Sequence, residues 1–194
     1  MVAGNRTLDV MRIRILGCSG GIGAGARTSA MLVDDDVLID AGTGIGDLAL
    51  AELQPIRHVF ITHAHLDHIA GLPFLVESVF EEDFDTPVTV YARDETVRAI
   101  QDHLFTDVIW PNFAHLPAPE HPMLRYQVCS PGDTVSLGHR DIHAVDDTHS
   151  VPSLGYTVQN SGGVFAVSGD TKTNETLWPV LNACEDLKVL VIEV

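Results

Sequence analysis

The stretch from Val59 to His68 reads VFITHAHLDH, and it places four side chains of metal-binding type within six positions, directly after an apolar run. The apolar run predicts a short buried strand. In extended backbone, residues two apart point the same way, so His63 and His65 can bind one ion together. Asp67 and His68 fall where the chain turns into an apolar helical stretch, and they can face a second ion. Core packing does not require this density of imidazole and carboxylate, whereas two transition metal ions held side by side do.

A polar loop with chance histidines is the alternative interpretation of this stretch, since the chain holds 10 His in 194 residues. Spaced His/Asp clusters of this kind are metal sites far more often than accidents. Imidazole suits zinc, and a carboxylate suits zinc or manganese. We therefore expect a centre of two divalent metal ions, with zinc as the first candidate and manganese or iron as the alternatives.

Length and charge limit the class of protein and its partners. A chain of 194 residues with 45% hydrophobic residues predicts one globular domain, which we assign to residues 12–194 after an N-terminal extension at residues 1–11. The formal net charge of -16 disfavours nucleic acid as a partner, because nucleic-acid binders carry basic patches. A small anionic substrate held by metal ions is compatible with that charge.

Cysteine usage and hydropathy predict a cytoplasmic protein without a membrane partner. The three cysteines, Cys18, Cys129 and Cys184, lie far apart and form no Cys-x-x-Cys pair, as expected of reduced thiols. The first dozen residues lack the basic start and apolar core of a signal peptide. No apolar run approaches the length of a membrane span.

Strand and turn patterns dominate the first forty residues. Residues 12–16 predict a strand, and residues 30–33 and 37–39 predict a hairpin around the acidic turn Asp34-Asp35-Asp36, which we expect to be solvated. The glycine-rich residues 17–25 follow the first strand. We interpret them as a flexible loop and not as a dinucleotide cradle, because no strong helical pattern follows the glycines.

Helical patterns alternate with short strands in the rest of the chain. The predicted helices cover residues 45–53, 69–80, 96–104 and 174–183, and a final strand covers 189–192. Two blocks of strands with helices between them predict an α/β protein in which packed sheets have helices outside.

The segment Thr62–His68 resembles the signature of the metallo-β-lactamase superfamily of hydrolases. Other stretches agree with that family in order: a strand ending in Asp40-Ala41-Gly42, the lone His149, and Ser168-Gly169-Asp170-Thr171 after a strand. Together they cover most of residues 12–194. The resemblance implies a four-layer αββα sandwich with the site at one edge of the two sheets.

The resemblance also implies a ligand set. The first metal ion would be held by His63, His65 and His149, and the second by Asp67, His68 and Asp170, with Asp170 bridging both. On their own, His149 is a histidine in a polar loop and Asp170 is a turn residue, so only their place in the family order singles them out. In the hydrolysis that the resemblance implies, the two metal ions would share a hydroxide that attacks the substrate. Asp67 would orient this hydroxide or take its proton. Asp40 would lie behind the ligands, with its carboxylate hydrogen-bonded to an imidazole.

Within the superfamily the chain resembles the class II cyclic-nucleotide phosphodiesterases. Those enzymes carry a leucine where Leu66 stands, and they resemble this chain at residues 109–113, 177–179 and 191–194. This implies hydrolysis of cyclic AMP or cyclic GMP to the nucleoside 5′-monophosphate, with a homodimer as one open oligomeric state. Residues 149–156 resemble ribonuclease Z, which is the nearest rival, although its pattern usually has glycine in place of Leu66.

Other functions remain open on the same residues. A metal-binding protein without turnover is a third hypothesis, and lactam or thioester hydrolysis is a fourth, since fold and metals do not fix the substrate. Trp110 and Phe113 are candidates for stacking on a nucleobase, with core packing as the alternative. His115 is a candidate proton donor, with a plain loop histidine as the alternative.

One departure from the family pattern concerns the second metal ion. The superfamily usually supplies a last histidine from a loop beyond the strand that ends here at Val194, and His121, His139 and His143 do not match it in order. A fragment, a ligand from another protomer and a weak second site are the three explanations. We favour the first, and so expect the chain to lack the last C-terminal elements of the fold.

Overall fold

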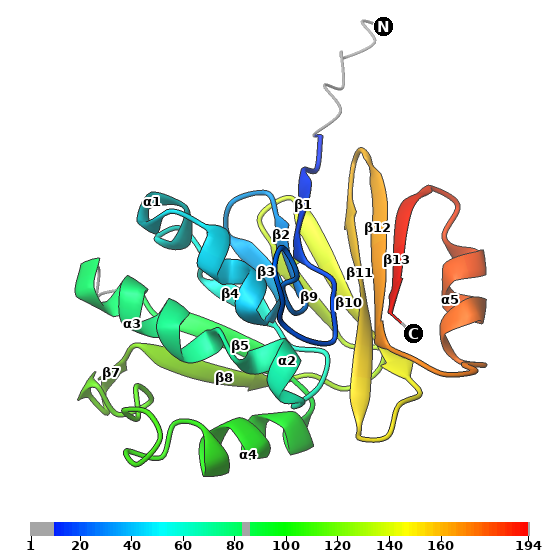
Figure 1. Cartoon of the computed structure of the whole chain (residues 1–194). Coiled ribbons are helices and arrows are strands. Elements are labelled where there is room, and N and C mark those ends of the chain that lie inside the picture. The colour runs from blue at the N-terminus through cyan, green and yellow to red at the C-terminus, as the bar shows by residue number, and fades with distance from the viewer. Residues whose placement is uncertain (1–9, 83–85, 194) are drawn as a thin grey trace, which may run out of the picture.

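Two β-sheets lie face to face between layers of helices in the computed structural model, which describes residues 10–82 and 86–193 (Figure 1). Residues 1–9 of the predicted N-terminal extension lie outside the described residues. Sheet one contains, in spatial order, β1 (Ile13–Gly17), β2 (Ala30–Val33), β3 (Val37–Ala41), β4 (His58–Phe60), β5 (Val88–Ala92) and β8 (Leu124–Val128). Sheet two contains β13 (Leu187–Glu193), β12 (Gly163–Asp170), β11 (Ser153–Asn160), β10 (Arg140–Asp147) and β9 (Thr134–Leu137). A small separate pair is formed by β6 (Pro117–Ala118) and β7 (His121–Pro122).

Each sheet combines antiparallel and parallel pairs. In sheet one, β1 to β3 are antiparallel, and β3, β4, β5 and β8 are parallel neighbours. In sheet two, β9 to β12 are antiparallel, and β13 runs parallel to β12. Segments at the carboxyl ends of β4, β12 and β13 build the candidate site described below.

Helices cover the outer face of each sheet. Sheet one packs against α1 (Leu50–Leu53), α2 (Leu66–Ile69), α3 (Leu72–Glu82) and α4 (Asp94–His103), and sheet two packs against α5 (Leu177–Ala183), as Figure 1 shows on its left and right sides. One apolar cluster lies beneath the first group of helices, a second lies between the sheets, and a third lies beneath α5. Both faces of sheet one are thus covered, which explains why β2 and β3 are apolar at almost every position. The predicted four-layer αββα fold is confirmed.

The predicted helix over residues 45–53 is wrong as a single element. A 3-10 helix, η1 (Thr43–Asp47), ends at Leu48, which is extended, and α1 begins only at Leu50. Glu52 accepts a hydrogen bond from the backbone N–H of Ala49 at 2.9 Å, which starts the second helix anew. The expected helices at 69–80 and 174–183 begin later than predicted, at Leu72 and Leu177.

The acidic turn has a structural role that its sequence did not reveal. Asp34, Asp35 and Asp36 do connect β2 to β3, but Arg140 of sheet two lies against them. Its guanidinium donates to Asp34 at 3.0 Å and to Asp36 at 2.7 Å, and Arg140 is only 5% exposed. The segment is a turn between two strands, as predicted, and its carboxylates are partly exposed, but two of them also join the sheets through Arg140. Among the described residues, the helices are all too short or too polar to span a lipid bilayer.

Candidate metal centre

The first two histidines, His63 and His65, follow β4 and lie at the carboxyl-terminal end of this interior strand of sheet one. The strand lies between its parallel neighbours β3 and β5, and the backbone N–H of Ile61 still bonds to Tyr91 O at 2.9 Å. The chain then leaves the sheet through a bend at Thr62, and His65, which precedes α2, is extended. As the alternation of extended backbone predicts, the rings of His63 and His65 meet, with Nε2 and Nδ1 2.9 Å apart.

The first donor group contains His63, His65, His149 and Asp170, each offering one ligand atom within 4.8 Å of the others. His149 comes from the loop between β10 and β11, and its Nε2 lies 3.2 Å from His65 Nδ1. Asp170 ends β12, and its Oδ2 lies 3.7 Å from His149 Nε2 and 3.9 Å from His63 Nε2. Two residues far apart in the chain thus complete a group that begins in the stretch 63–65.

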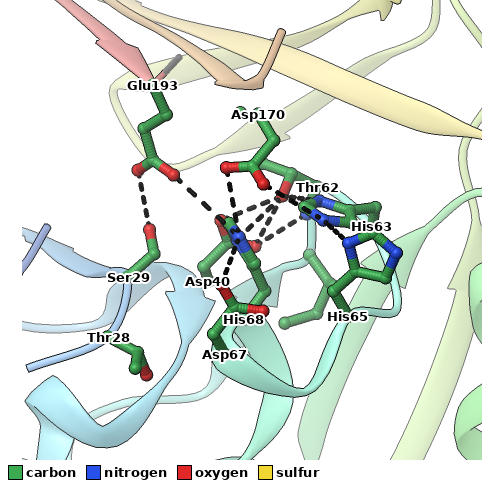
Figure 2. Close-up of polar contacts among 12 residues, drawn as sticks. Thr28, Ser29, Asp40, Thr62, His63, His65, Asp67, His68, Asp170 and Glu193 are labelled. Carbon is green, nitrogen blue, oxygen red and sulfur yellow. Dashed lines mark hydrogen bonds and ion pairs between the residues drawn. The ribbon is translucent and has the colours of Figure 1, made fainter. Parts of the chain in front are cut away.

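The second donor group contains Asp67, His68 and Asp170. Nε2 of His68 lies 3.4 Å from Asp170 Oδ1 and 3.7 Å from Asp67 Oδ2. The two oxygens of Asp170 therefore face different groups, as its labelled side chain in Figure 2 illustrates. The structure brings together all six of the predicted site residues.

Asp40 and Thr62 lie behind the donors and hold them. Asp40 is fully buried, and its Oδ2 lies 2.7 Å from His68 Nδ1, while Oδ1 accepts the backbone N–H of Thr62 at 2.8 Å. The Thr62 hydroxyl also lies 3.1 Å from His63 Nδ1. A carboxylate that accepts Nδ1–H fixes the tautomer of the ring, so that Nε2 of His68 is left to face Asp67 and Asp170.

The electrostatics of the two groups differ. Burial, followed by the charge of the neighbouring imidazoles, lowers the pKa of His63 to about 2, so this ring is neutral at pH 7. Burial also opposes a charge on His68, but the Asp40 carboxylate, with smaller effects of Glu193 and Asp170, raises the pKa of His68 to about 9. The second group thus gathers an excess of negative charge, which a cation can neutralise.

Glu193 reaches this site from the carboxyl end of β13, and we did not predict it as a site residue. Its Oε2 lies 4.0 Å from His68 Nε2, and Ser29 donates a hydrogen bond to its Oε1 at 2.7 Å (Figure 2). Burial and the nearby Asp40 raise the pKa of Glu193 to about 7, against the hydrogen bond from Ser29. Its place follows from the structure, because Glu193 pairs in register with Asp170 on the neighbouring parallel strand. No local sequence signal marks it.

The donor set fits a metal centre, because hydrogen bonds among its side chains cannot satisfy all of its ring nitrogens. Nδ1 of His65 has ring nitrogens of His63 and His149 within 3.2 Å, and one ring N–H can bond to only one of them. Imidazole nitrogen and carboxylate oxygen are the ligands that zinc takes in catalytic sites. Asp170 has an oxygen for each group, which is the arrangement that two neighbouring cations need. The cluster is consistent with a site for divalent metal ions.

The other predicted candidates serve the core or the surface. Phe113 is buried within the apolar cluster beneath α3 and α4, and Trp110 packs against the same cluster. The Trp110 ring lies 5.0 Å from that of Phe74, measured between centroids. Core packing, the alternative to base stacking, accounts for both aromatic residues. His115 is exposed on the loop before β6.

Comparison with known proteins adds a family and several relatives. A family model described as the beta-lactamase superfamily domain matches residues 35–194. A probable 3′,5′-cyclic-nucleotide phosphodiesterase of Yersinia pestis is 28% identical over 92% of this chain and 63% of its own length. A ribonuclease Z of Methanococcus maripaludis is 30% identical over 52% of this chain and 31% of its own length. The chain therefore spans less than two thirds of the length of these relatives.

A solved structure shares the fold. Unliganded yeast PDE1 matches with a TM-score of 0.77 at 21% identity, over 94% of this chain and 74% of that one. At this level of identity the likeness concerns the arrangement of the sheets and helices.

Proposed function

The chain belongs to the metallo-β-lactamase superfamily, and on that premise we propose that it is a metal-dependent phosphodiesterase that hydrolyses 3′,5′-cyclic nucleotides to nucleoside 5′-monophosphates. One observation carries the proposal: two groups of His and Asp donors share a single carboxylate, that of Asp170. Two cations that share a carboxylate would supply the arrangement that phosphoester hydrolases use to stabilise both the attacking and the leaving oxygen.

The donor groups define which side chains would hold the cations. His63, His65 and His149 would hold one, Asp67 and His68 would hold the other, and Asp170 would contact both. When bound, the cations supply Lewis-acid stabilisation of the phosphoryl oxygens and lower the pKa of water. The protein supplies a neutral imidazole at His63 for this purpose, since burial keeps the pKa of His63 far below 7.

Asp67 is the residue to which we assign proton handling. Its side chain is 27% exposed, so one carboxylate oxygen can face His68 while the other faces an incoming water. From there it can orient the water and accept its proton. Attack of the water oxygen in line with the 3′ oxygen forms a new P–O bond and breaks the P–O3′ bond. The proton that Asp67 accepts from the water balances the proton that the 3′ oxygen takes up as it leaves as the ribose hydroxyl.

Three observations support a cyclic nucleotide as the substrate. The Yersinia relative named as such a phosphodiesterase aligns over 92% of this chain. Leu66 stands at the position that distinguishes the class II phosphodiesterase pattern from that of ribonuclease Z. The net charge of -16 disfavours a polyanionic RNA but tolerates a small substrate with a single phosphodiester charge.

A ribonuclease Z-like activity is the second candidate, favoured by the 30% identity to the Methanococcus ribonuclease Z. It predicts cleavage of precursor tRNA, which the same preparation can test.

The activity test uses the purified chain loaded with zinc or manganese. We expect it to convert cyclic AMP or cyclic GMP to the 5′-monophosphate and to leave precursor tRNA intact. Chromatography of the products measures the conversion. Asp170→Ala should lower the rate by about a thousandfold or more, because both donor groups lose a shared ligand. His143→Ala is the matched control, since its ring bonds to Thr134 on β9 outside the site. Cleavage of tRNA without turnover of cyclic nucleotides would favour the second candidate.

Metal content separates an enzyme from a metal-binding protein without turnover. We expect two zinc ions per chain by elemental analysis. One tightly bound ion with no hydrolysis of either substrate would contradict the proposed function and support the non-catalytic alternative.

A further inference from the structure

One buried amide ties the loop that carries His149 to the segment that follows Asp170. We propose that Asn174 is a positioning residue that holds His149 and Asp170 at the spacing required by the first donor group. The inference rests on the proposed function in one respect, namely that this group holds a metal ion.

The first side of this connection is the base of the His149 loop. Asn174 is 1% exposed, and its Nδ2 donates to Asp147 Oδ1 at 2.6 Å. Asp147 is the last residue of β10 and is 7% exposed. Its second oxygen accepts the hydroxyl of Ser153, the first residue of β11, at 3.1 Å. A single buried carboxylate thus closes both ends of the loop that carries His149.

The second side is the segment that leaves β12. Nδ2 of Asn174 also donates to Thr171 Oγ1 at 3.2 Å, directly after Asp170. The backbone N–H of Lys172 donates to Thr148 O at 3.0 Å, next to His149. In Figure 1 the loop between β10 and β11 and the segment between β12 and α5 accordingly lie at the same end of sheet two.

The amide also fixes its own position against α5. Oδ1 of Asn174 accepts the backbone N–H groups of Thr176 and Leu177, each at 2.9 Å, at the start of this helix. Both halves of the amide are therefore used, with donors toward Asp147 and Thr171 and the acceptor toward the helix. Aspartate has a similar shape but no donor, so it cannot take this place beside a carboxylate.

The consequence for the site is geometric. His149 and Asp170 come from different strands, and their facing atoms are 3.7 Å apart. A metal centre demands that ligands from separate segments keep their spacing within fractions of an ångström. Asn174 connects Asp147, two residues before His149, with Thr171, which follows Asp170, and the bond from Lys172 N–H to Thr148 O lies beside it. These bonds limit how far the two ligands can separate.

The test reverses the polarity of the Asn174–Asp147 pair. Asn174→Asp sets two carboxylates against each other. Direct hydrogen-bond partners of a metal ligand are worth about 10- to 100-fold in affinity. Because Asn174 acts through neighbours of the ligands, we expect the lower end of that range, about 10-fold weaker binding of the tightest zinc ion. The double variant Asn174→Asp with Asp147→Asn places an amide at position 147 and a carboxylate at position 174. The hydrogen bond can form again in the opposite direction, so we expect zinc affinity within about threefold of the wild type.

A control distinguishes positioning from general loss of stability. Leu181→Ala removes a buried side chain of α5 that packs against sheet two but makes no hydrogen bond to Asp147. Zinc affinity is measured by competition with a chromophoric chelator, and the thermal midpoint of the metal-free protein is measured beside it. We expect Leu181→Ala to lower the midpoint as much as Asn174→Asp does while leaving zinc affinity nearly unchanged.

The outcomes separate this inference from the proposed function. Wild-type zinc affinity in Asn174→Asp, or no recovery in a folded double variant, overturns the positioning role while the proposed activity stands. Zinc binding that follows the expected pattern without turnover of any cyclic nucleotide contradicts the proposed activity and leaves the role of Asn174 supported.

Discussion

At the scale of single residues, Asp40 adopts a backbone conformation that most side chains avoid. Its φ is +55°, in the left-handed region, where Asn and Asp are tolerated better than other non-glycine residues. Asp40 lies at an irregularity in the register of β2 and β3, between the pairs Met31–Ile39 and Ala30–Ala41. Its fully buried carboxylate faces Thr62 and His68. Local strain of this kind persists where the surrounding structure over-determines it, as the backbone N–H and the hydroxyl of Thr62, both donating to the Asp40 carboxylate, do here.

The first prediction concerns the charge of Asp40. Asp40→Asn keeps a residue that tolerates the left-handed region but removes one acceptor, so His68 Nδ1–H and Thr62 N–H can no longer both be satisfied. We expect zinc affinity of the second donor group to fall about 10- to 100-fold, with the first group unchanged. Dialysis against a weak chelator followed by elemental analysis should leave one zinc per chain. Retention of two would show that Asp40 does not tune the second group.

Sequence reasoning at this scale succeeded where a local periodicity applied. His63 and His65 meet, as the two-residue repeat of extended backbone predicts. His149 and Asp170 have no such local signal, and only the family order pointed to them. Glu193 was missed because its place depends on β13 lying beside β12, a long-range pairing that a single sequence does not reveal.

At the scale of elements, close backbone contacts fix the loops around the site. The Cα of Gly42, just after β3, approaches the metal-site loop so closely that a Cβ there would lie 2.2 Å from Asp67 O and 2.4 Å from Thr28 Oγ1. Gly71, between α2 and α3, would place a Cβ 2.6 Å from Gly42 O. The start of α2, which carries Asp67 and His68, is therefore seated directly on the end of β3.

The second prediction tests that contact. Gly42→Ala forces the Asp67 loop away, and we expect it to lower the free energy of unfolding by about 1–3 kcal/mol, as overpacking does. Gly46→Ala is the control, because a Cβ at Gly46 meets nothing within 4 Å, and it should change stability by less than about 0.5 kcal/mol. Urea unfolding of the metal-free proteins measures both. Equal midpoints for the two variants would contradict the packing argument.

The same contacts explain which elements the sequence could not delimit. Residues 45–53 have helical periodicity, but close packing of Gly44 on the backbone of Leu16 and the extended Leu48 break them into two short pieces. The helix expected from residue 69 begins at Leu72, because the backbone N–H of Gly71 bonds to Ala41 O at 2.7 Å. The strands predicted at residues 30–33 and 37–39 were easier to find, since β2 and β3 are short apolar runs around a clear turn.

At the scale of the whole molecule, the two sheets are joined at the edge opposite the metal centre. The site occupies the carboxyl end of β4, whereas the turn between β2 and β3 lies beside the amino end of β4, where the backbone N–H groups of Arg57 and His58 bond to Asp36 O. Arg140 crosses there from sheet two to Asp34 and Asp36, over 100 residues away in sequence. The fold class could be inferred from the order of the motifs. This contact between the sheets could not, because no sequence pattern links Arg140 to Asp34 and Asp36.

The third prediction concerns this contact. Arg140→Met keeps most of the apolar stem but removes the guanidinium, leaving Asp34 and Asp36 to repel each other. A fully buried ion pair costs about 3–5 kcal/mol when one partner is lost, and an exposed pair costs about 0–1 kcal/mol. Because the Asp34 and Asp36 side chains are 22% and 40% exposed, we expect an intermediate loss of about 2 kcal/mol.

The matched control is Arg98→Met, which removes a guanidinium paired with Asp94 on the surface of α4, where the Arg98 side chain is 70% exposed. It should lower the free energy of unfolding by less than about 0.5 kcal/mol. Denaturant unfolding followed both by tryptophan fluorescence and by circular dichroism measures the two variants. The probes should give one shared midpoint in Arg140→Met, since the apolar cluster between the sheets makes them unfold together. Two separate midpoints would mean that Arg140, and not the buried apolar interface, couples sheet one to sheet two.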